Sequence, residues 1–376
     1  MPKSEIKKDL RKTLKKSGMK MDQNFYRGKK IFLSGHSGFK GAWLSCWLKM
    51  MGAKVCGFSL KPENESLFNI LELSQELDES HFGDIRNVQL LEKTINNFQP
   101  EIIIHMAAQA LVKSSYFDPR TTYETNVIGT LNIFEAARKA GSVKAIVNIT
   151  TDKCYENKEI NYAYREEDPM GGYDPYSSSK ACAEILTSSY RRSFMQKEGI
   201  ALASVRAGNV IGGGDFSIDR IIPDIFRSIR DGKKVELRSP NAIRPWQHVM
   251  EPLLGYLTLA QNLFEKGNDF AKAYNFGPDF DAQENVETLT KNFIQKIGVG
   301  AYEINASADL HEAGILMLNN NRAKNELNWQ PKLSFDETIS WTADWYKNYQ
   351  ENKDDVKNFT IGQIKKFLAK KSKSLS

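Results

Sequence analysis

Short apolar runs alternate with longer amphipathic stretches between residues 30 and 206. Apolar runs of this length, bounded by glycine or polar residues, are typical of buried strands. They occur at Lys30–Ser34, Ala53–Phe58, His81–Ile85 (as a strand end), Glu101–His105, Lys144–Ile149 and Ile200–Arg206. The stretches between them predict helices, including Ala42–Met51, Pro119–Lys139 and a segment from Tyr176 to about Glu198. This alternation predicts an α/β fold with a parallel, doubly wound sheet.

The first strand runs directly into a glycine-rich turn, GHSGFKG, that opens the helix Ala42–Met51. Gly52 ends that helix, and the second strand follows. Glycines allow a tight turn and close backbone approach, while the helix N-terminus attracts a pyrophosphate. The spacing is GxxGxxG rather than GxGxxG, so the strand–turn–helix context carries the prediction of a dinucleotide site.

A second group of residues suggests acid–base chemistry. Tyr176 and Lys180 are four residues apart, on one face of a predicted helix. A nearby ammonium favours the phenolate, which makes such a Tyr a usable base near neutral pH. Thr151, Asp152 and Lys153 directly follow an apolar strand, whose carboxyl end faces the ligand crevice of an open α/β sheet. A Tyr–Lys pair alone also occurs by chance on surface helices. The strand and helix pattern of the residues before this pair favours a catalytic site.

The pattern changes after Ala207, where a glycine-rich stretch and several arginines follow. A helix is predicted from Pro223, a strand or turn at Arg244–Val249, and one more sheet strand at Ala273–Phe276. A late amphipathic helix carries Trp341, Trp345 and Tyr346. We therefore expect a Rossmann-type domain over 21–206 with returning segments near 245–276, and a smaller substrate lobe over 207–350.

Charge is concentrated at the chain ends. The formal net charge is +6, and residues 1–20 alone carry eight Lys or Arg and two acids. We expect 1–20 to be a basic N-terminal extension and 351–376 a solvated Lys-rich tail, with a short helix at each end as the alternative. The tails lack an aromatic and basic platform behind them, so we expect no nucleic-acid binding. No apolar run approaches membrane-spanning length, so we expect no membrane insertion.

The four cysteines have no CxxC pair and no zinc-like spacing, which predicts no metal site. Cys46, Cys56 and Cys182 lie in apolar or small-residue runs, where we expect buried thiols, and Cys154 lies close to the proposed site. A reduced, cytoplasmic setting fits this usage.

Six segments of the chain resemble the extended short-chain dehydrogenase/reductase superfamily: GHSGFKGAWL, HMAAQALV, TTDKCYEN, DPMGGYDPYSSSK, RAGNVIGGGD and RPWQHV. Within it, the chain is most similar to the CDP-glucose 4,6-dehydratase family, from about Met21 to Tyr346. The string TDKCYEN is the specific part. Related dTDP-glucose dehydratases have Glu in place of Lys153, and epimerases lack the Asp–Lys pair.

The resemblance implies a role for each catalytic residue. Tyr176, aided by Lys180 and Thr151, takes the proton of the sugar 4-hydroxyl while a hydride passes from C4 to NAD. Lys153 removes the C5 proton, Asp152 protonates the departing 6-hydroxyl, and the hydride returns to C6 without net redox change. A lysine base must be partly neutral, and we expect Lys180 and a positive nicotinamide to lower the pKa of Lys153.

The resemblance also implies binding residues. Those expected around NAD are Gly35, Gly38, Phe39, Gly41, Asp84, Ile85, Ala107, Ala108 and Gln109, together with Tyr176 and Lys180. Arg244 is expected on the nucleotide diphosphate, and Asn209 and Arg220 on the substrate, with plain surface charge as the alternative for both arginines. The second strand ends without an acid for the ribose hydroxyls, which leaves NADP open. Since the hydride is returned, the reaction starts from oxidised cofactor, and we expect NAD.

The implied product is CDP-4-dehydro-6-deoxy-D-glucose, for deoxysugar and cell-surface polysaccharide (O-antigen) synthesis, and the implied assembly is a homodimer. Three alternatives stay open: a nucleotide-sugar 4-epimerase or reductase, a dehydratase for another nucleotide sugar, and a non-catalytic NAD-binding scaffold. The Asp152–Lys153 pair argues against the first, because neither reaction needs an acid and a base at C5 and C6.

Overall fold

The computed structural model describes residues 21–279, 283–305 and 314–371. The expected extension at 1–20 and the last five residues lie outside them. Among the described residues, no helix combines the length and apolar character needed to cross a lipid bilayer. Their four cysteines are free thiols, but Cys182 is exposed rather than buried as expected.

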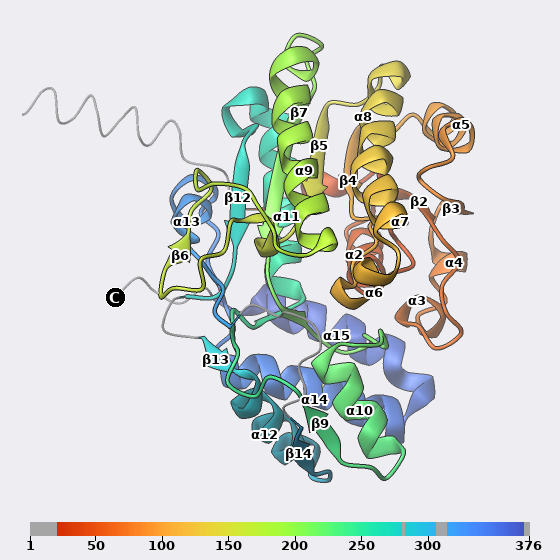
Figure 1. The fold of residues 1–376 in the computed structure, drawn as a ribbon. Coiled ribbons are helices and arrows are strands. Elements are labelled where there is room, and N and C mark those ends of the chain that lie inside the picture. Colours follow the sequence, from red (N-terminus) through yellow and green to blue (C-terminus); the bar gives the residue numbers. More distant parts are fainter. Residues whose placement is uncertain (1–20, 280–282, 306–313, 372–376) are drawn as a thin grey trace, which may run out of the picture.

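A seven-stranded parallel sheet forms the centre of the molecule (Figure 1), in the order β12-β7-β5-β4-β1-β2-β3. Its neighbouring strands all run parallel, which confirms the predicted fold class. The strands are β1 (Lys30–Ser34), β2 (Lys54–Ser59), β3 (Glu79–Phe82), β4 (Ile102–His105), β5 (Ala145–Ile149), β7 (Ala201–Ala207) and β12 (Ala273–Phe276). The third strand ends before Gly83, so Asp84 and Ile85 lie just beyond its carboxyl end.

Helices cover both faces of this sheet, which explains why its central strands are largely apolar, whereas the edge strand β3 carries Glu79, Ser80 and His81. Ile31 and Leu33 of β1 face one hydrophobic cluster, and Phe32 between them faces the other. The first cluster includes α2 (Phe39–Met50) and α11 (Met250–Lys266). The second includes α5 (Val88–Phe98), α8 (Gly129–Ala140) and the end of α9 (Pro175–Tyr190). The reversal of strand order between β1 and β4 opens the crevice where ligands bind in such folds.

The predicted helix at 119–139 consists of three pieces: α7 (Pro119–Tyr123), a π-helical turn η2 (Glu124–Ile128) and α8. Gly141, with φ of 69°, ends it as expected. A second π-helical turn, η4 (Arg191–Met195), extends α9. The shorter elements in the first half of the chain are η1 (Gln23–Tyr26), α3 (Leu67–Ile70), α4 (Leu73–Glu76), α6 (Val112–Phe117) and η3 (Asp152–Cys154).

A smaller lobe lies below the sheet in Figure 1. It contains α10 (Ile221–Arg230), α12 (Val286–Ile297), α14 (Phe335–Glu351) and the strand pair β9 (Val235–Leu237) and β14 (Tyr302–Ile304). Between the two parts, α11, η5 (Gly267–Phe270), β12 and α13 (Asn321–Leu327) return to the sheet. Short pairs connect the loops: β8 (Val210–Ile211) with β11 (Gln247–His248), β10 (Ile243–Arg244) with β13 (Glu284–Asn285), and β6 (Ala163–Tyr164) with β15 (Met317–Leu318).

The segment at 356–369 is packed against the core, so the expectation of a solvated tail is wrong there, while residues 351–355 are exposed. After η7 (Lys353–Asp355), α15 (Val356–Ala369) buries Val356, Ile364 and Phe367 completely. The Phe367 ring meets Trp47 of α2 edge-on, 5.9 Å between centroids. The lysine content concealed an apolar stripe at helical spacing, which is what buries a surface helix.

Candidate active site

The turn after β5 carries three of the predicted catalytic residues. Thr151 caps η3: its hydroxyl accepts from the Lys153 N–H at 3.3 Å and donates to Asp152 Oδ1 at 2.9 Å. Asp152 is 1% exposed, and its Oδ2 has no hydrogen-bond partner within the described part of the chain. A Cβ on Gly208 would lie 2.0 Å from that oxygen, so only glycine leaves room for the carboxyl there.

The other two predicted catalytic residues lie on α9, in and just after its first turn. Asp174 caps this helix by accepting from the Ser177 N–H at 2.9 Å. Gly172 precedes it with φ of 114°, and a Cβ there would lie 2.5 Å from the backbone of Ser177. The Lys180 ammonium donates to the carbonyl of Ile149 at 3.1 Å, which joins the helix to the end of β5.

Burial dominates the electrostatics of this pair. It raises the pKa of Tyr176 to about 12; the interaction with the Thr151 side chain and the charge of Arg220 act in the opposite direction, and Asp152 raises it further. Burial and the nearby Lys40 lower the pKa of Lys180 to about 8. The expectation of a lowered Tyr176 pKa is therefore wrong for the protein groups alone. Tyr176 nevertheless lies close to the turn after β5, because it interacts with both Thr151 and Asp152.

A buried ion pair supports the catalytic turn from behind. Arg206 Nη2 of β7 lies 2.9 Å from Glu184 Oε2 of α9, and both side chains are about 5% exposed or less. Glu184 also accepts from Thr150 Oγ1 at 2.5 Å, while Arg206 Nη1 donates to the Tyr155 hydroxyl at 2.7 Å. Burial opposes ionisation of Glu184, but Arg206 and the hydrogen bonds outweigh it and lower its pKa. Thr150 and Tyr155 bracket the catalytic turn, which is thus fixed at both ends.

The glycine turn before α2 has the form expected of a pyrophosphate cradle. Gly35 has φ of 76°, and a Cβ there would lie 2.8 Å from the amide nitrogen of Ala107. A Cβ on Gly41 would lie 2.0 Å from the Gly35 carbonyl oxygen. Gly38 is the N-cap of α2, where no side chain caps the helix, and Phe39 follows it. The turn, the helix N-terminus and the Ala107–Ala108 loop therefore come together without intervening side chains.

Three predicted cofactor residues are already engaged with the protein. Asp84 accepts from Arg86 Nη2 at 2.7 Å, and that pairing lowers its pKa. Ile85 is 3% exposed, with its side chain in the core against Gly129, so only its main chain is available to a ligand. Gln109 donates from Nε2 to Thr122 Oγ1 at 2.9 Å, which ties its loop to α7.

The predicted substrate residues are spread over the junction of the two parts. Arg220, the N-cap residue of α10, lies 3.1 Å from the buried Asp215 carboxylate and close enough to Tyr176 to affect its pKa. Asn209 follows β7 with φ of 28°, and its carbonyl accepts from the Gln247 N–H at 3.2 Å. Arg244 is 5% exposed and donates to the carbonyls of Ile243 and Gly314 at 3.0 and 3.3 Å. Arg220 thus lies near Tyr176, and the substrate-binding roles of all three residues stay predictions.

Comparison with known sequences identifies the family. The family model described as GDP-mannose 4,6 dehydratase matches residues 32–342. The chain belongs to this 4,6-dehydratase family. It is 47% identical over 341 residues to the CDP-glucose 4,6-dehydratase of Salmonella typhimurium, covering 89% of this chain and 95% of that one. A dTDP-glucose 4,6-dehydratase of Streptomyces antibioticus is 29% identical, over 71% of this chain and 75% of the relative.

Solved structures share the fold of this 4,6-dehydratase family member. The dTDP-glucose 4,6-dehydratase of Bacillus anthracis, in complex with NAD, has a TM-score of 0.71 at 24% identity and covers 86% of this chain and 98% of its own. A UDP-glucose 4-epimerase of Stenotrophomonas maltophila with bound NAD has a TM-score of 0.75 at 18% identity, over 86% and 99%. Dehydratases and epimerases therefore share one scaffold, and the side chains in the crevice must distinguish them.

Sequence reasoning missed two residues of this dehydratase-family site. Lys40, inside the glycine turn, is half-buried, and its charge acts on Lys180 and on Asp152. Burial and the nearby Arg220 lower the pKa of Lys40 to about 8. The sequence signal for Lys40 is its position inside the glycine turn that is predicted to bind the nucleotide. The sequence places Gly208 only within a glycine-rich stretch, because no local pattern indicates that it faces Asp152.

Proposed function

We propose that the protein catalyses the dehydration of CDP-D-glucose to CDP-4-dehydro-6-deoxy-D-glucose, with NAD as cofactor and no net redox change. The position of Asp152 near Tyr176, with Lys153 next to it in the same turn, carries the proposal, since it offers an acid and a base in addition to the oxidising Tyr–Lys pair. The 47% identical relative named CDP-glucose 4,6-dehydratase supports the choice of substrate.

The residues around the glycine turn fit NAD. Gly35, Gly38 and Gly41 leave space beside the first turn of α2, whose amides favour a pyrophosphate. Asp84 and the Ala107–Ala108 loop follow β3 and β4, which β1 and β2 separate in the sheet. When bound, NAD would supply reversible hydride transfer at the sugar. Dehydratase structures of this fold with NAD bound support NAD rather than NADP.

The side chains supply the proton transfers. Tyr176 takes the proton of the sugar 4-hydroxyl, and the 4-ketone so formed acidifies C5–H. Lys153, when neutral, removes the C5 proton, and Asp152, when protonated, gives its proton to the departing 6-hydroxyl, which leaves as water. C5 later regains a proton that has exchanged with solvent. The unpartnered Oδ2 of Asp152 is the oxygen available for this transfer.

The direct test is to incubate the purified protein with CDP-glucose and NAD in deuterated water. We expect a 4-keto-6-deoxy product with deuterium at C5 and no accumulation of NADH. NADH that rises in proportion to product would instead show an ordinary dehydrogenase. A product that keeps its 6-hydroxyl but has the opposite configuration at C4 would show an epimerase.

Two substitutions separate the first two chemical steps. Tyr176→Phe should block oxidation, so that no NADH-like absorbance forms on mixing. Lys153→Met should still oxidise C4 but lose C5 exchange, with turnover lower by about 10²–10⁴-fold. Lys158→Met removes an exposed lysine from the same loop and serves as the matched control. Normal C5 exchange in Lys153→Met would assign the base to another residue.

The nucleotide base is the open part of the substrate assignment. The family description names GDP-mannose, and a 29% identical relative is named for dTDP-glucose. We expect the highest kcat/KM with CDP-glucose when the three sugar nucleotides are compared. A higher value for either of the others would keep the reaction and change the substrate.

We also infer a homodimer in a reduced, cytoplasmic setting, acting in deoxysugar and cell-surface polysaccharide (O-antigen) synthesis. Exposed apolar side chains of α7, η2 and α9 support the dimer: Tyr123, Ile128 and Ile185 are 38, 48 and 60% exposed, and these elements contact one another. Ile185→Glu should yield a monomer in sedimentation velocity. A parent chain that sediments as a monomer would exclude this interface.

A further inference from the structure

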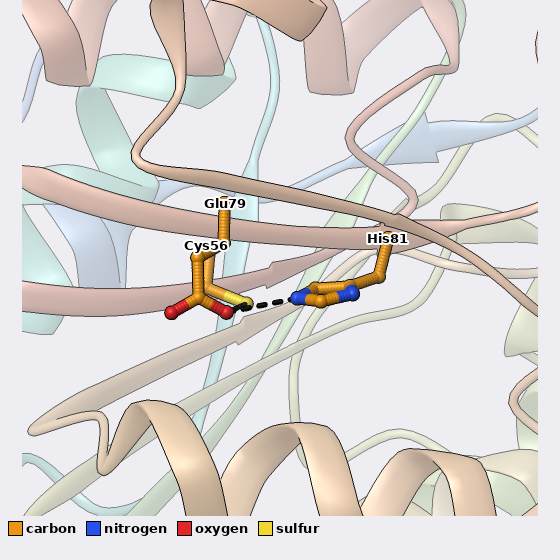
Figure 2. A group of neighbouring side chains, drawn as sticks. All are labelled: Cys56, Glu79 and His81. Atoms are coloured by element: carbon orange, nitrogen blue, oxygen red, sulfur yellow. Dashed lines mark hydrogen bonds and ion pairs between the residues drawn. The ribbon is translucent and has the colours of Figure 1, made fainter.

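Three potential metal ligands converge at the edge of the central sheet, away from the catalytic turn. Cys56 in β2 lies opposite Glu79 in β3, the edge strand, in the parallel register. His81 follows Glu79 by two residues and therefore projects from the same face of the strand. In Figure 2, Cys56 and Glu79 lie side by side, and the His81 ring points back toward them.

The distances suit a single small cation. His81 Nε2 lies 2.8 Å from Glu79 Oε2, and Cys56 Sγ lies 3.9 Å from the same oxygen. All three ligand atoms lie within 4.8 Å of one another. Around tetrahedral zinc, bonds of about 2.0–2.3 Å place neighbouring ligand atoms roughly 3–4 Å apart. Small side-chain rotations are therefore enough to surround an ion.

Burial differs among the ligands in a way that leaves an entry path. Cys56 is 0% exposed and belongs to the core cluster on that face of the sheet. The side chains of His81 and Glu79 are 41 and 39% exposed. The Cys56 thiolate would thus bind the ion on its buried side, and the His81 and Glu79 side chains would bind it on the side that faces solvent. A fourth position would face solvent and take water.

The ligand chemistry selects the class of cation. Thiolate and imidazole together favour zinc and similar borderline metals over magnesium or calcium, which prefer oxygen ligands. We propose that Cys56, Glu79 and His81 form a three-ligand site for Zn²⁺ that joins β2 to β3. Burial and the Glu79 carboxylate raise the pKa of the Cys56 thiol, so its proton is released to solvent as the sulfur–metal bond forms.

Such a site would stabilise the edge of the dinucleotide-binding half. β3 leads directly into Asp84, so a bond between β2 and β3 would restrain that end of the crevice without entering the catalytic turn. The spacing of cysteines along the chain could not indicate this site, because it holds a single cysteine and its ligands come from two strands.

The test uses the full, untagged chain after metal removal, titrated with Co²⁺ and then with Zn²⁺. We expect one equivalent of Co²⁺ to produce a thiolate-to-cobalt charge-transfer band, which Zn²⁺ abolishes by displacement, and Zn²⁺ to raise the melting temperature. Cys56→Ser should eliminate the band. His81→Gln, at a half-exposed position, should weaken the binding of Co²⁺ and Zn²⁺ by at least about 10-fold, since even the loss of a residue that only hydrogen-bonds to a metal ligand has an effect of that size.

Cys182→Ser is the matched control, because Cys182 is an exposed free thiol on α9. It should leave the band and the affinity unchanged. Circular dichroism shows whether each variant is folded. If Cys56→Ser does not fold, His81→Gln still tests the site. Absence of a stoichiometric band in the folded parent, a band that Cys182→Ser removes, or parent affinity in His81→Gln would overturn the proposal.

Discussion

Gly208 offers a way to displace the proposed acid without changing it. A Cβ at this position would lie 2.0 Å from Asp152 Oδ2, 2.7 Å from its Cγ and 2.9 Å from Pro245 Cγ. Non-bonded carbon and oxygen atoms do not approach that closely, so Gly208→Ala must push the carboxyl aside by about 1 Å or more. Overpacking of this kind typically costs about 1–3 kcal/mol of stability, which leaves a folded protein to assay.

The expected loss of activity follows from that displacement. A misplacement of about 1 Å at a reacting group can cost about 10²-fold in rate, and a general acid contributes about 10²–10⁴-fold in all. We therefore expect Gly208→Ala to lower kcat by roughly 10²-fold. The three atoms nearest to the new methyl group belong to Asp152 and Pro245 rather than to Tyr176 or Lys153, so oxidation at C4 and exchange at C5 should continue.

Proton NMR in deuterated water follows both events in one sample: loss of the C5–H signal and appearance of the 6-deoxy methyl group. Gly208→Ala should exchange C5–H while forming little methyl product, and Asp152→Asn should behave in the same way. If folded Gly208→Ala turns over within a few-fold of the parent, Asp152 does not act from the observed position and the acid must be sought elsewhere.

Three further predictions concern stability. Arg206→Met leaves Glu184 as an unpaired buried charge, and we expect a loss of about 3–5 kcal/mol in urea unfolding; the Glu184→Gln/Arg206→Met double variant should recover part of it, and no recovery would mean that the pair is not the cause. Gly362→Ala, in open space on α15, should raise the free energy of unfolding by about 0.5–1 kcal/mol, whereas a decrease would contradict a packed helix there. Burial lowers the pKa of both His105 and His248 to about 3, from 6.5 in the unfolded chain. Below pH 6.5 the unfolded chain therefore takes up protons that the folded chain does not, and stability should fall toward pH 3 by up to about 1.4 kcal/mol per pH unit for each histidine. His248→Gln should flatten that slope between pH 6.5 and 4, and an equal slope would assign the acid sensitivity to other groups.

The fold could be predicted because its signals are local. Runs such as Ile102–His105 are apolar on both faces, which fits a strand covered by helices on both sides, and glycine and proline mark the turns between elements. The position of the candidate catalytic residues could be predicted for a related reason: Thr151, Asp152 and Lys153 follow a strand, and the carboxyl end of a parallel strand has a defined place in such a sheet.

What the sequence did not reveal depends on contacts between distant segments. Gly208 and Asp152 are far apart in the chain, and their close approach arises only when β7 lies beside β5. The raised pKa of Tyr176 reflects burial, which outweighs the neighbouring positive charges, and a four-residue spacing gives no measure of it. The apolar stripe of α15 was present in the sequence, but its lysines directed attention to charge rather than to periodicity.

The position of α15 has a consequence for synthesis of the chain. The dinucleotide-binding half leaves the ribosome first, yet the Trp47 side of its first helix is covered by Phe367, near the opposite end of the chain. Lys332 also donates to the carbonyl of Phe367 at 3.1 Å, so the last helix is bound to both halves. Folding of the first half therefore cannot be completed before α15 has been made. A nascent chain stalled at residue 350 would leave tryptophan surface exposed to chaperones and proteases until α15 emerges.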